Sequence, residues 1–501
     1  MGEKSEVFYL GEGPPLEVLD KLPTPEEVFK VPRIGRKELF LYCLGPAIIA
    51  MGGAIGSGEW LMGPVIAAKY GLGLFWLVWV GALLQAFYNS AFARITIATG
   101  EPPGVWMTRA PPRTFWLLFI PVILFISWAW PGWALGAATA VMTFIYGHLP
   151  TTPEEITMVK ICGIILFFIC LAIVSVGAKI ERTLEIWSYF VVFGVTILLF
   201  IALGFALALS PYAGEAVSEF GRGLISVGYI PKGIDIFTFG GWWGYTGWAT
   251  CLNWMLINYY RDKGYGMGHK VGYIPAIIGG RKVALSGTGK TFKPTKENVE
   301  TFKRWTRLVA YDQWLIYFPF ALLGMYLPAL FVRALVPVGT ELPKWGIAAH
   351  VAPEFAKLVG PWGLYFIAFI GAVVLFSTQV QVADTFMRNV TDIVWSGSET
   401  IREKCKGDVR YLYYGIFLAY IVFASCVIWF KAPLWYLLLM ANMANFGAFY
   451  TIPLLWYFDR KMPEELRIPK WWWPFLIVFG AICAFIFIAM ILGKVFGIVI
   501  F

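Results

Sequence analysis

Glu59 is the residue whose type and place most clearly suggest chemistry. It lies in the glycine-rich stretch GGAIGSGEW (residues 52–60), inside a long apolar run. Glycines weaken a helix, and an unwound segment would expose backbone carbonyl oxygens around Ala54. Such oxygens and a carboxylate suit a cation or a proton, whereas the plainer alternative is a neutral glutamate that donates to one free carbonyl. We therefore predict a substrate site, with Glu59 as its metal ligand, at Gly56, Ser57, Gly58 and Glu59.

A second glycine-rich stretch, GGWWGYTGW (residues 240–248), interrupts another apolar run. Its glycines and polar side chains predict a second break in a helix, which would form the opposite wall of the same site. Tryptophans at such a place more commonly pack than bind a ligand, so packing is the alternative for each of them. The predicted substrate-binding residues here are Tyr245, Thr246, Trp248, Thr250 and Cys251.

Further polar residues lie in runs that are otherwise apolar. The stretch STQVQVADTF (377–386) is too polar for a helix that faces lipid, so it should line a cavity or face the helix bundle. Asn442 and Asn445 could reach the site or only join helices, and Asp312 could serve a gate, a salt bridge or coupling. The accessory candidates are Asn253, Asp312, Ser377, Thr378, Gln381, Asp384, Asn442 and Asn445.

The sequence shows no recognisable catalytic or cofactor site. The histidines, His148, His269 and His350, fall in or near loops and belong to no Ser-His-Asp set. The stretch ALSGTGKT (284–291) fits a relaxed phosphate-binding loop, but no hydrophobic strand precedes it and Pro294 interrupts the helix that should follow. We expect no enzyme activity, no cofactor, no bound nucleotide and no nucleic acid partner.

The elements that would position the candidate residues are membrane helices. Hydrophobic residues make up 59% of the 501 residues and charged residues only 14%, which is not typical of a soluble domain. We predict an all-α polytopic membrane protein with about 11 transmembrane helices, each long enough to cross about 30 Å of hydrocarbon. The predicted spans are 39–68, 73–98, 114–147, 157–177, 187–210, 236–260, 308–335, 355–387, 411–430, 433–457 and 472–499.

The basic residues predict the orientation of these spans. Most of the 40 lysines and arginines fall in the N-terminal tail and in every second loop, as the positive-inside rule requires. We therefore expect a cytoplasmic N-terminus, an odd number of spans and an outer C-terminus, in the plasma membrane with lipid as the surrounding partner. The formal charge of +9 then needs no nucleic acid to explain it.

The two glycine-rich breaks fall in the first and sixth predicted spans. Breaks at matching positions of two five-span halves predict a 5+5 inverted repeat, as in many transporters, with the substrate site between the breaks. The alternative is that these glycines only let helices pack closely. The predicted domains are a tail (1–37), a first repeat (38–210), a second repeat (211–458) with an inner loop (261–307), and an additional eleventh helix (459–501).

Four segments carry a resemblance to a known family: GPAIIAMGGAIGSGEW (45–60), AAKYGLGLFW (67–76), ARITIATGE (93–101) and NFGAFYTIPLLWYFDR (445–460). They resemble the Nramp (natural resistance-associated macrophage protein) family of divalent-metal transporters, and the resemblance extends over most of residues 40–495. It implies a fold like that of the leucine transporter (LeuT), in which helices 1 and 6 are discontinuous.

The metal motifs of that family are altered in this sequence. The Asp-Pro-Gly-Asn motif of its first span corresponds to residues 56–59, and the Met-Pro-His-Asn motif of its sixth span corresponds to residues 248–251. Loss of the soft methionine sulfur, together with the added carboxylate, favours a hard and partly hydrated cation. No acid lies in the third span, so the proton route of the family is not carried over.

These observations predict a secondary active transporter that moves a divalent metal cation by alternating access. One alternative keeps the fold but changes the cargo to an amino acid, an amine or another small organic solute, which the aromatic residues of the second break would suit. Another alternative is a membrane receptor that transports nothing.

Overall fold

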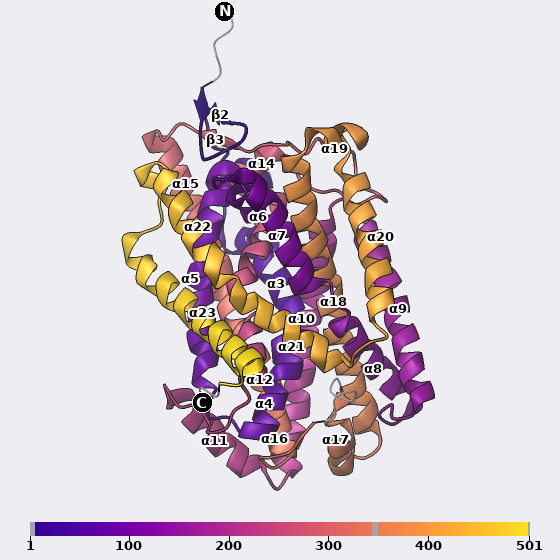
Figure 1. Ribbon diagram of the computed structural model, residues 1–501. Helices are drawn as coiled ribbons and strands as arrows, with labels where there is room; N and C mark the ends of the chain where they lie inside the picture. Colours follow the sequence, from indigo (N-terminus) through magenta and orange to yellow (C-terminus); the bar gives the residue numbers. More distant parts are fainter. Residues whose placement is uncertain (1–5, 343–348, 499–501) are drawn as a thin grey trace, which may run out of the picture.

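The computed structural model describes residues 6–342 and 349–498, except for the side chains of Ser57 and Gly58. Helices dominate the molecule, and a small three-stranded sheet lies at one end of it (Figure 1). Eight helices in the described residues are long and apolar enough to cross a membrane. The chain is a helical, polytopic integral membrane protein, and the predicted fold class is confirmed.

The eight candidate spans correspond to eight of the predicted ones. They are Arg113–Tyr146, Pro153–Ser175, Ile180–Leu209, Lys296–Leu335, Trp362–Gly397, Val409–Val427, Pro433–Lys461 and Lys470–Phe496. The remaining predicted spans are the two that contain the glycine-rich stretches and the one formed by α5 (Trp76–Thr99). α5 carries Gln85, Asn89 and Arg94, so it is less apolar than the others and packs largely inside the protein.

The helices that form these eight spans are α7 (Arg113–Trp128), α8 (Gly132–Tyr146), α9 (Pro153–Ser175), α10 (Ile180–Leu209), α15 (Lys296–Asp312), η4 (Gln313–Tyr317), α16 (Phe318–Leu335), α18 (Trp362–Gly397), α20 (Val409–Val427), α21 (Pro433–Phe446), α22 (Ala448–Lys461), η7 (Lys470–Trp472) and α23 (Trp473–Phe496). Shorter helices lie before these spans or between them: α1 (Pro25–Phe29), α2 (Arg36–Glu38), η1 (Leu39–Cys43), α6 (Pro103–Met107), α11 (Ala213–Ile225), α14 (Gly268–Val271), α17 (Ala352–Val359), α19 (Glu399–Lys404) and η6 (Glu464–Leu466).

The first glycine-rich stretch remains helical, which differs from the unwound segment that we expected. The chain passes from α3 (Pro46–Ala54) through a π-helical segment, η2 (Ile55–Met62), into α4 (Gly63–Tyr70). A π-helix bonds each N–H to the carbonyl five residues earlier, so it widens the helix without abandoning its hydrogen bonds. The glycines therefore mark a local departure from α-geometry rather than a gap in the helix.

The second glycine-rich stretch does interrupt its helix, as predicted. α12 (Ile236–Gly244) ends at the stretch, and a 3-10 segment, η3 (Thr250–Ile257), leads on into α13 (Asn258–Lys263). Between them Gly247 has a φ of 76°. Thr250, the first residue of η3, has a φ of 39°, in the left-handed region that a residue with a side chain seldom adopts. The sixth span is therefore discontinuous near its middle.

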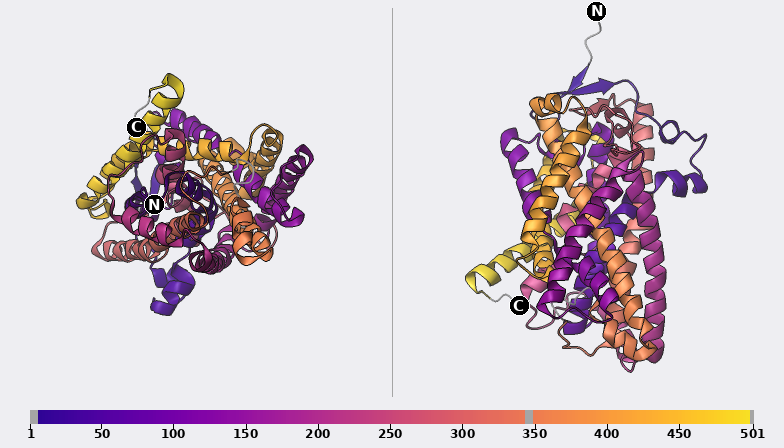
Figure 2. Two further views of the ribbon diagram at one scale, coloured as in Figure 1. Left: turned by 90° about the horizontal axis from the view of Figure 1, so that it is seen from below. Right: turned by 90° about the vertical axis from the view of Figure 1, so that its right-hand side faces the viewer.

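The interrupted spans lie inside the bundle. α18 packs against α3, η2 and α8, α10 packs against α3 and α16, and α12 packs against α21. The sheet, α14, α15 and α19 lie at one end of the molecule, whereas α11 and α17 lie at the other (Figure 1). α23 runs obliquely along the outside of the bundle, where Figure 2 shows it in yellow.

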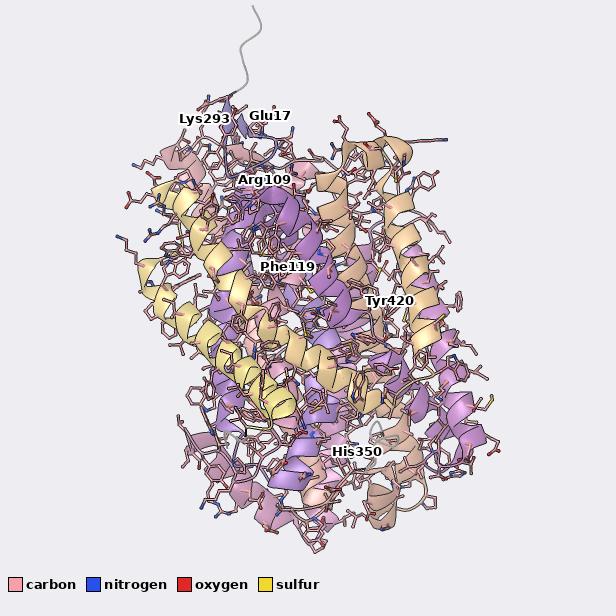
Figure 3. The ribbon with its side chains drawn as sticks, viewed as in Figure 1. Glu17, Arg109, Phe119, Lys293, His350 and Tyr420 are labelled. Carbon is pink, nitrogen blue, oxygen red and sulfur yellow. The ribbon has the colours of Figure 1, made fainter. Side chains whose placement is uncertain are left out.

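The N-terminal segment, predicted only as a tail, takes part in the small sheet. β1 (Val7–Phe8) pairs antiparallel with β2 (Leu16–Leu19), and β2 pairs in parallel with β3 (Lys290–Phe292) of the long loop. Glu17 on β2 forms an ion pair with Lys290 on β3, with 2.8 Å between Oε2 and Nζ. Figure 3 labels Glu17 at this end of the molecule. The N-terminal segment is thus fastened to the loop that follows the sixth span.

A buried ion pair holds the glycine-containing loop stretch beside the sheet. The guanidinium of Arg109 donates two hydrogen bonds to Glu101, at 2.6 and 2.7 Å, and further bonds to Pro14 O and Thr288 Oγ1. The backbone N–H of Gly289 donates to Glu101 Oε1 at 2.7 Å. Arg109 is labelled just below the sheet in Figure 3. The stretch 284–291 therefore packs against the end of the second span.

Asn298 should be important for holding the N-terminal segment in place. Its Oδ1 accepts a hydrogen bond from Leu22 N (3.0 Å), and its Nδ2 donates to Asp20 O (2.7 Å) and Lys293 O (2.9 Å). We expect Asn298→Leu to loosen residues 6–35 by about 1–3 kcal/mol, because buried backbone groups lose their partners. Hydrogen exchange read by mass spectrometry should show faster exchange there. Unchanged exchange, or an equal change in the exposed control Glu300→Leu, would contradict this prediction.

Candidate functional site

Glu59 is a buried carboxylate in η2, between α16 and α18. Its side chain is only 1% exposed, and its Oε1 has no hydrogen-bond partner in the described residues. It points toward α16, because a Cβ added to Gly324 would collide with its carboxylate. Gly56 faces the other side, where an added Cβ would collide with Thr378 and Val374 of α18. A buried carboxylate with an unused oxygen requires a proton or a cation.

Two of the predicted site residues, Ser57 and Gly58, are described by their backbone alone. Their assignment to the site remains a prediction.

A network of polar side chains surrounds the break in the sixth span. Asn253 Nδ2 lies 2.7 Å from both Gln85 Oε1 and Tyr317 Oη, and it donates to both. Gln85 Nε2 donates to the carbonyl oxygen of Thr246 at 2.6 Å, and Asn253 Oδ1 accepts from Ala249 N at 2.8 Å. The predicted residues Thr246 and Asn253 are therefore brought together by α5 and η4, which the sequence did not suggest.

The asparagines of α21 bind the other half of the sixth span. Asn445 Nδ2 donates to Gly240 O at 2.9 Å, and Asn442 Nδ2 donates to Phe237 O at 3.0 Å. Thr250 Oγ1 donates to Asn445 Oδ1 at 3.3 Å, which joins the end of the break to the same helix. The predicted residues Thr250, Asn442 and Asn445 thus lie together, and their hydrogen bonds connect α12 and η3 to α21.

Cys251 lies at the start of η3 and is fully buried. Its carbonyl oxygen accepts from Tyr88 Oη at 2.7 Å, and Trp243 Nε1 donates to the neighbouring Cys483 Sγ at 3.3 Å. Within the described part of the chain, no group of three or more His, Cys, Asp or Glu residues could hold a metal ion. Glu59 therefore belongs to no cluster of three such side chains in the described residues.

Aromatic rings fill the space beside the break. Trp248 stacks on Trp128 with ring centroids 5.0 Å apart, Trp128 stacks on Trp133 at 5.6 Å, and Trp133 meets Tyr245 edge to face at 5.8 Å. Trp128 and Trp133 flank a break between α7 and α8 in the third span that the sequence did not suggest. Their indole N–H groups are buried and have no hydrogen-bond partner in the described residues. Aromatic faces and unused donors thus line one side of the predicted site.

The polar residues of α18 meet the glycines of the first span. Ser377 Oγ donates to Gly52 O at 2.9 Å. A Cβ on Gly53 would lie 2.9 Å from Trp248 Nε1 and 3.0 Å from Gln381 Oε1, a buried oxygen without a partner among the described residues. Spans 1, 6 and 8 therefore converge where the sequence placed the site, and only glycines leave room for this approach.

Thr378 and Asp312 have local structural roles. Thr378 Oγ1 donates to the carbonyl of Val374 one turn earlier in α18. Asp312 caps α3, because its carboxylate accepts hydrogen bonds from Gly45 N (3.1 Å) and Ala47 N (2.9 Å). A carboxylate is stabilised at a helix N-terminus by the free N–H groups and the helix dipole. Asp312 therefore ties the seventh span to the first.

Asp384 belongs to a cluster of buried charges, which we call the ion cluster. Its carboxylate accepts two hydrogen bonds from Arg388 at 3.0 Å, one from Tyr413 Oη at 2.6 Å and one from Tyr259 Oη at 2.8 Å. Arg388 also pairs with Asp262, so α18 is joined to α13 at the end of the sixth span. The Arg388 side chain is fully buried.

The ion cluster extends on both sides of Asp384. Arg261 donates to both oxygens of Asp392 at 2.9 Å. Lys263 Nζ lies 2.8 Å from Glu185 and 3.7 Å from Glu181, both on α10. The cluster comprises Glu181, Glu185, Arg261, Asp262, Lys263, Asp384, Arg388 and Asp392. Only Asp384 was a candidate in the sequence. The cluster joins the end of the sixth span to spans 5 and 8.

Gly244 should be intolerant of any side chain. An added Cβ would collide with the backbone carbonyl of Ala441, so α12 would have to move away from α21. We expect Gly244→Ala to cost about 1–3 kcal/mol of stability through overpacking. Thermal unfolding in detergent measures this effect. Gly415→Ala on α20 is the control, because nothing lies within 4 Å of its added Cβ. Equal unfolding temperatures for the two variants would contradict the prediction.

Comparison with known proteins gives matches only at the level of structure. No family model and no curated protein matches the chain. A mutant of the Eremococcus coleocola manganese transporter aligns with a TM-score of 0.64 and 15% identity, over 95% of this chain and 91% of that chain. The same transporter in complex with an aromatic bis-isothiourea substituted compound aligns with a TM-score of 0.62 and 15% identity, over 93% and 90%.

A more distant match has a different ligand. MhsT in complex with L-phenylalanine aligns with a TM-score of 0.52 and 16% identity, over 89% of this chain and 97% of that chain. The resemblance noted in the sequence is thus matched by likeness in structure over nearly the whole chain. The chain has the LeuT fold that these transporters share.

Proposed function

We propose that the chain is a secondary active transporter that works by alternating access, and that it is not an enzyme. The observation that carries this proposal is the break in the sixth span, which faces the π-helical first span at a place where Gly53, Trp248 and Gln381 meet. Breaks of this kind supply transporters with a substrate site near the middle of the membrane. The likeness to the manganese transporter over 95% of the chain supports it.

The ion cluster supplies the closed side of such a mechanism. It joins α13 to α10 and α18, and α13 packs against α14 at the end of the molecule where the sheet lies (Figure 1). A transporter must separate its site from one side of the membrane at a time. The cluster would have to open to release a solute on that side, which is the cytoplasmic side in the orientation that the basic residues favour.

A hard divalent cation is the cargo that we propose. Glu59 supplies a buried carboxylate whose Oε1 has no hydrogen-bond partner among the described residues. Oxygen ligands and a partly retained hydration shell suit magnesium, calcium or manganese ions better than soft metals. The manganese transporter with the same fold supports this class of cargo.

A small organic solute is the second candidate, and a separate observation favours it. Trp248, Trp128, Trp133 and Tyr245 form a continuous aromatic wall at the break, with two unused indole N–H donors. Such a wall suits the body of an amino acid or an amine more than a bare ion. MhsT, which has the same fold, was solved with L-phenylalanine.

Uptake into proteoliposomes separates these candidates. Saturable uptake of Mn²⁺ or Mg²⁺ is the expected result, and it should compete with Ca²⁺. Uptake of a labelled amino acid or amine without metal uptake would overturn the proposed cargo and favour the second candidate. Absence of flux for every solute, in vesicles that hold folded protein, would overturn transport itself and favour a receptor.

We further propose the plasma membrane, a cytoplasmic N-terminus and an outer C-terminus, because most basic residues fall in the N-terminal tail and in every second loop. Residues 38–210 and 211–458 would form the two inverted repeats, with the loop 261–307 on the cytoplasmic side, and 459–501 would add the eleventh helix. The tail 1–37 would then join the sheet on that side.

A further inference from the structure

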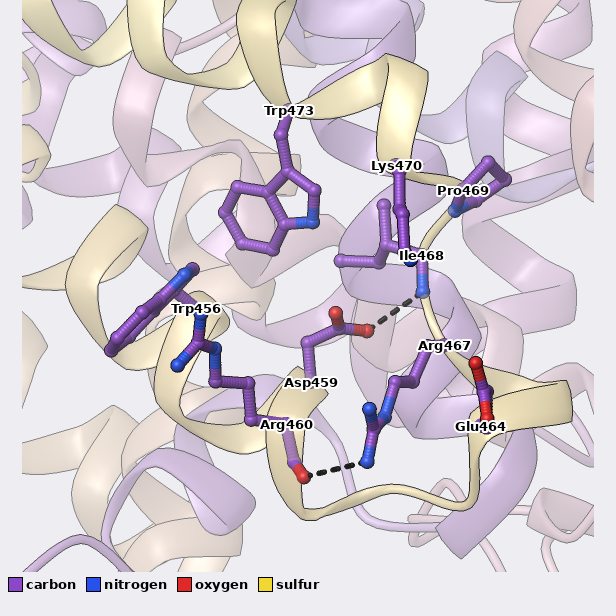
Figure 4. A pocket seen from close by; sticks show the side chains of 9 residues that line it. All are labelled: Trp456, Asp459, Arg460, Glu464, Arg467, Ile468, Pro469, Lys470 and Trp473. Atoms are coloured by element: carbon purple, nitrogen blue, oxygen red, sulfur yellow. Dashed lines mark hydrogen bonds between the residues drawn. The ribbon is translucent and has the colours of Figure 1, made fainter.

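A cavity of about 660 Å³ lies between the end of α22 and the start of α23. Its lining includes three basic side chains and two tryptophans beside two acids (Figure 4). These residues are Arg460, Arg467, Lys470, Trp456, Trp473, Asp459 and Glu464. None of these residues belongs to the proposed transport site. A basic cavity between membrane helices requires its own explanation.

Arg460 and Lys470 are available to a ligand, whereas Arg467 already donates to Met462 O at 2.9 Å and to Arg460 O at 3.1 Å. All three side chains are exposed, and no ion pair joins any of them to a carboxylate in the described part of the chain. The guanidinium of Arg460 lies 3.9 Å from the centre of the Trp456 ring, which orients it without neutralising it. A cluster of unpaired positive charges attracts an anion, most strongly a phosphate.

Of the two acids in the lining, Asp459 is already engaged, whereas Glu464 is exposed and forms no ion pair among the described residues. Asp459 Oδ1 accepts a hydrogen bond from Ile468 N at 2.7 Å, which Figure 4 marks with a dashed line. Arg94 of α5 donates to the carbonyls of Leu466 and Arg467 at 3.2 and 2.8 Å. These bonds fix the connection between α22 and α23, so the cavity is already formed before a ligand arrives.

The position of the cavity indicates what kind of anion reaches it. The end of α22 lies toward the end of the molecule that carries the sheet (Figure 1), and α15 packs against η6 of the same connection. The neighbouring helix α23 is largely exposed, with apolar side chains such as Ile477 (58%) and Phe485 (51%). Exposed tryptophans, including Trp471 at 62%, are typical of the level of lipid headgroups.

We propose that this cavity binds the phosphate headgroup of an anionic phospholipid, whose acyl chains lie along α23. Basic pockets between helices on the cytoplasmic side are the usual place for such headgroups. The tryptophans would contact the glycerol region, and Arg460 and Lys470 would contact the phosphate. The bound lipid would hold the oblique eleventh helix against α22.

Thermal unfolding of the delipidated protein with short-chain lipids tests the proposal. Dioctanoylphosphatidylglycerol should raise the unfolding temperature in a saturable way, whereas dioctanoylphosphatidylcholine and inorganic phosphate should not. Arg460→Gln/Lys470→Gln should weaken the apparent affinity about tenfold or more, since each surface cation near anionic lipid contributes about 1 kcal/mol. The control Lys296→Gln/Lys303→Gln removes two exposed lysines of α15 at the same end and should leave the affinity unchanged.

Three results would overturn the proposal. Equal protection by inorganic phosphate would assign the cavity to a free phosphate group, and equal protection by the choline lipid would exclude recognition of charge. An unchanged affinity in the double variant would place the lipid elsewhere. Should the double variant be poorly folded, Lys470→Gln alone gives the same test, because the side chain of Lys470 is exposed and makes no ion pair among the described residues.

Discussion

Glu59→Gln should strongly reduce metal uptake while leaving the protein folded. The amide keeps the shape of the carboxylate but not its charge, so the cation loses an acidic ligand. We expect uptake of Mn²⁺ or Mg²⁺ into proteoliposomes to fall about tenfold or more, the factor that corresponds to about 1.5–3 kcal/mol for a contact to a charged group. The unfolding temperature should be unchanged or higher. A buried carboxylate with an oxygen that lacks a partner among the described residues lowers the stability of the folded protein, and the neutral amide removes that cost.

A loss of uptake without a loss of stability makes the prediction specific. Glu403→Gln in α19 is the matched control, because it makes the same chemical change at an exposed position away from the site and should alter neither uptake nor unfolding. Unchanged uptake in Glu59→Gln would show that Glu59 does not bind the transported cation. A joint loss of uptake and of stability would instead assign Glu59 a structural role.

Arg388→Met should produce the largest loss of stability of any variant considered. Arg388 is fully buried and pairs with Asp384 and Asp262. Its removal leaves the buried carboxylate of Asp384 without a cation, whereas Asp262 keeps Arg261. Breaking a buried pair in this way typically costs about 3–5 kcal/mol. Thermal unfolding in detergent measures the effect, and uptake should fall as well because the ion cluster no longer closes the end of the sixth span.

A second substitution tests the cause of this loss. Arg388→Met/Asp384→Asn should recover part of the stability, because one uncompensated charge is then removed. Lys357→Met is the control, since Lys357 pairs with Glu354 at 2.7 Å on the surface, and such pairs contribute at most about 1 kcal/mol. A loss in Arg388→Met no larger than in Lys357→Met would show that the cluster does not hold the helices together.

Much of the fold could be predicted from the sequence because it depends on hydropathy and on glycine. The apolar runs located eight of the spans, and the glycines of residues 240–248 located the break in the sixth. The same reasoning failed for η2, because glycines indicate a weak α-helix without indicating what replaces it. A π-helix keeps the hydrogen bonds that an unwound segment would lose in hydrocarbon. The break at residues 129–131 followed from no glycine cluster and was missed.

The candidate site was predictable only where one stretch carried the signal. Glu59 and the polar residues of α18 stand out against apolar neighbours, and the structure brings Gln381 to the glycines of the first span. The ion cluster joins residues that are far apart in sequence, so no stretch revealed it. One signal was present: Asp384, Arg388 and Asp392 recur at a spacing of four, which places them on one face of a helix. That helix continues to Gly397, beyond the predicted end of the eighth span.

The parallel pairing of β2 with β3 also constrains the order of events during synthesis. The N-terminal strand leaves the ribosome first, but Asn298, which accepts from Leu22, lies 276 residues later in the chain. Translation proceeds at about 5–20 residues per second, so synthesis of the intervening chain takes on the order of 10 to 60 s. The sheet can form only after the sixth span has been synthesised. Its formation would therefore indicate that the first half of the protein has been inserted into the membrane. An N-terminal fluorophore with an acceptor in the loop would time this step in a translating cell extract.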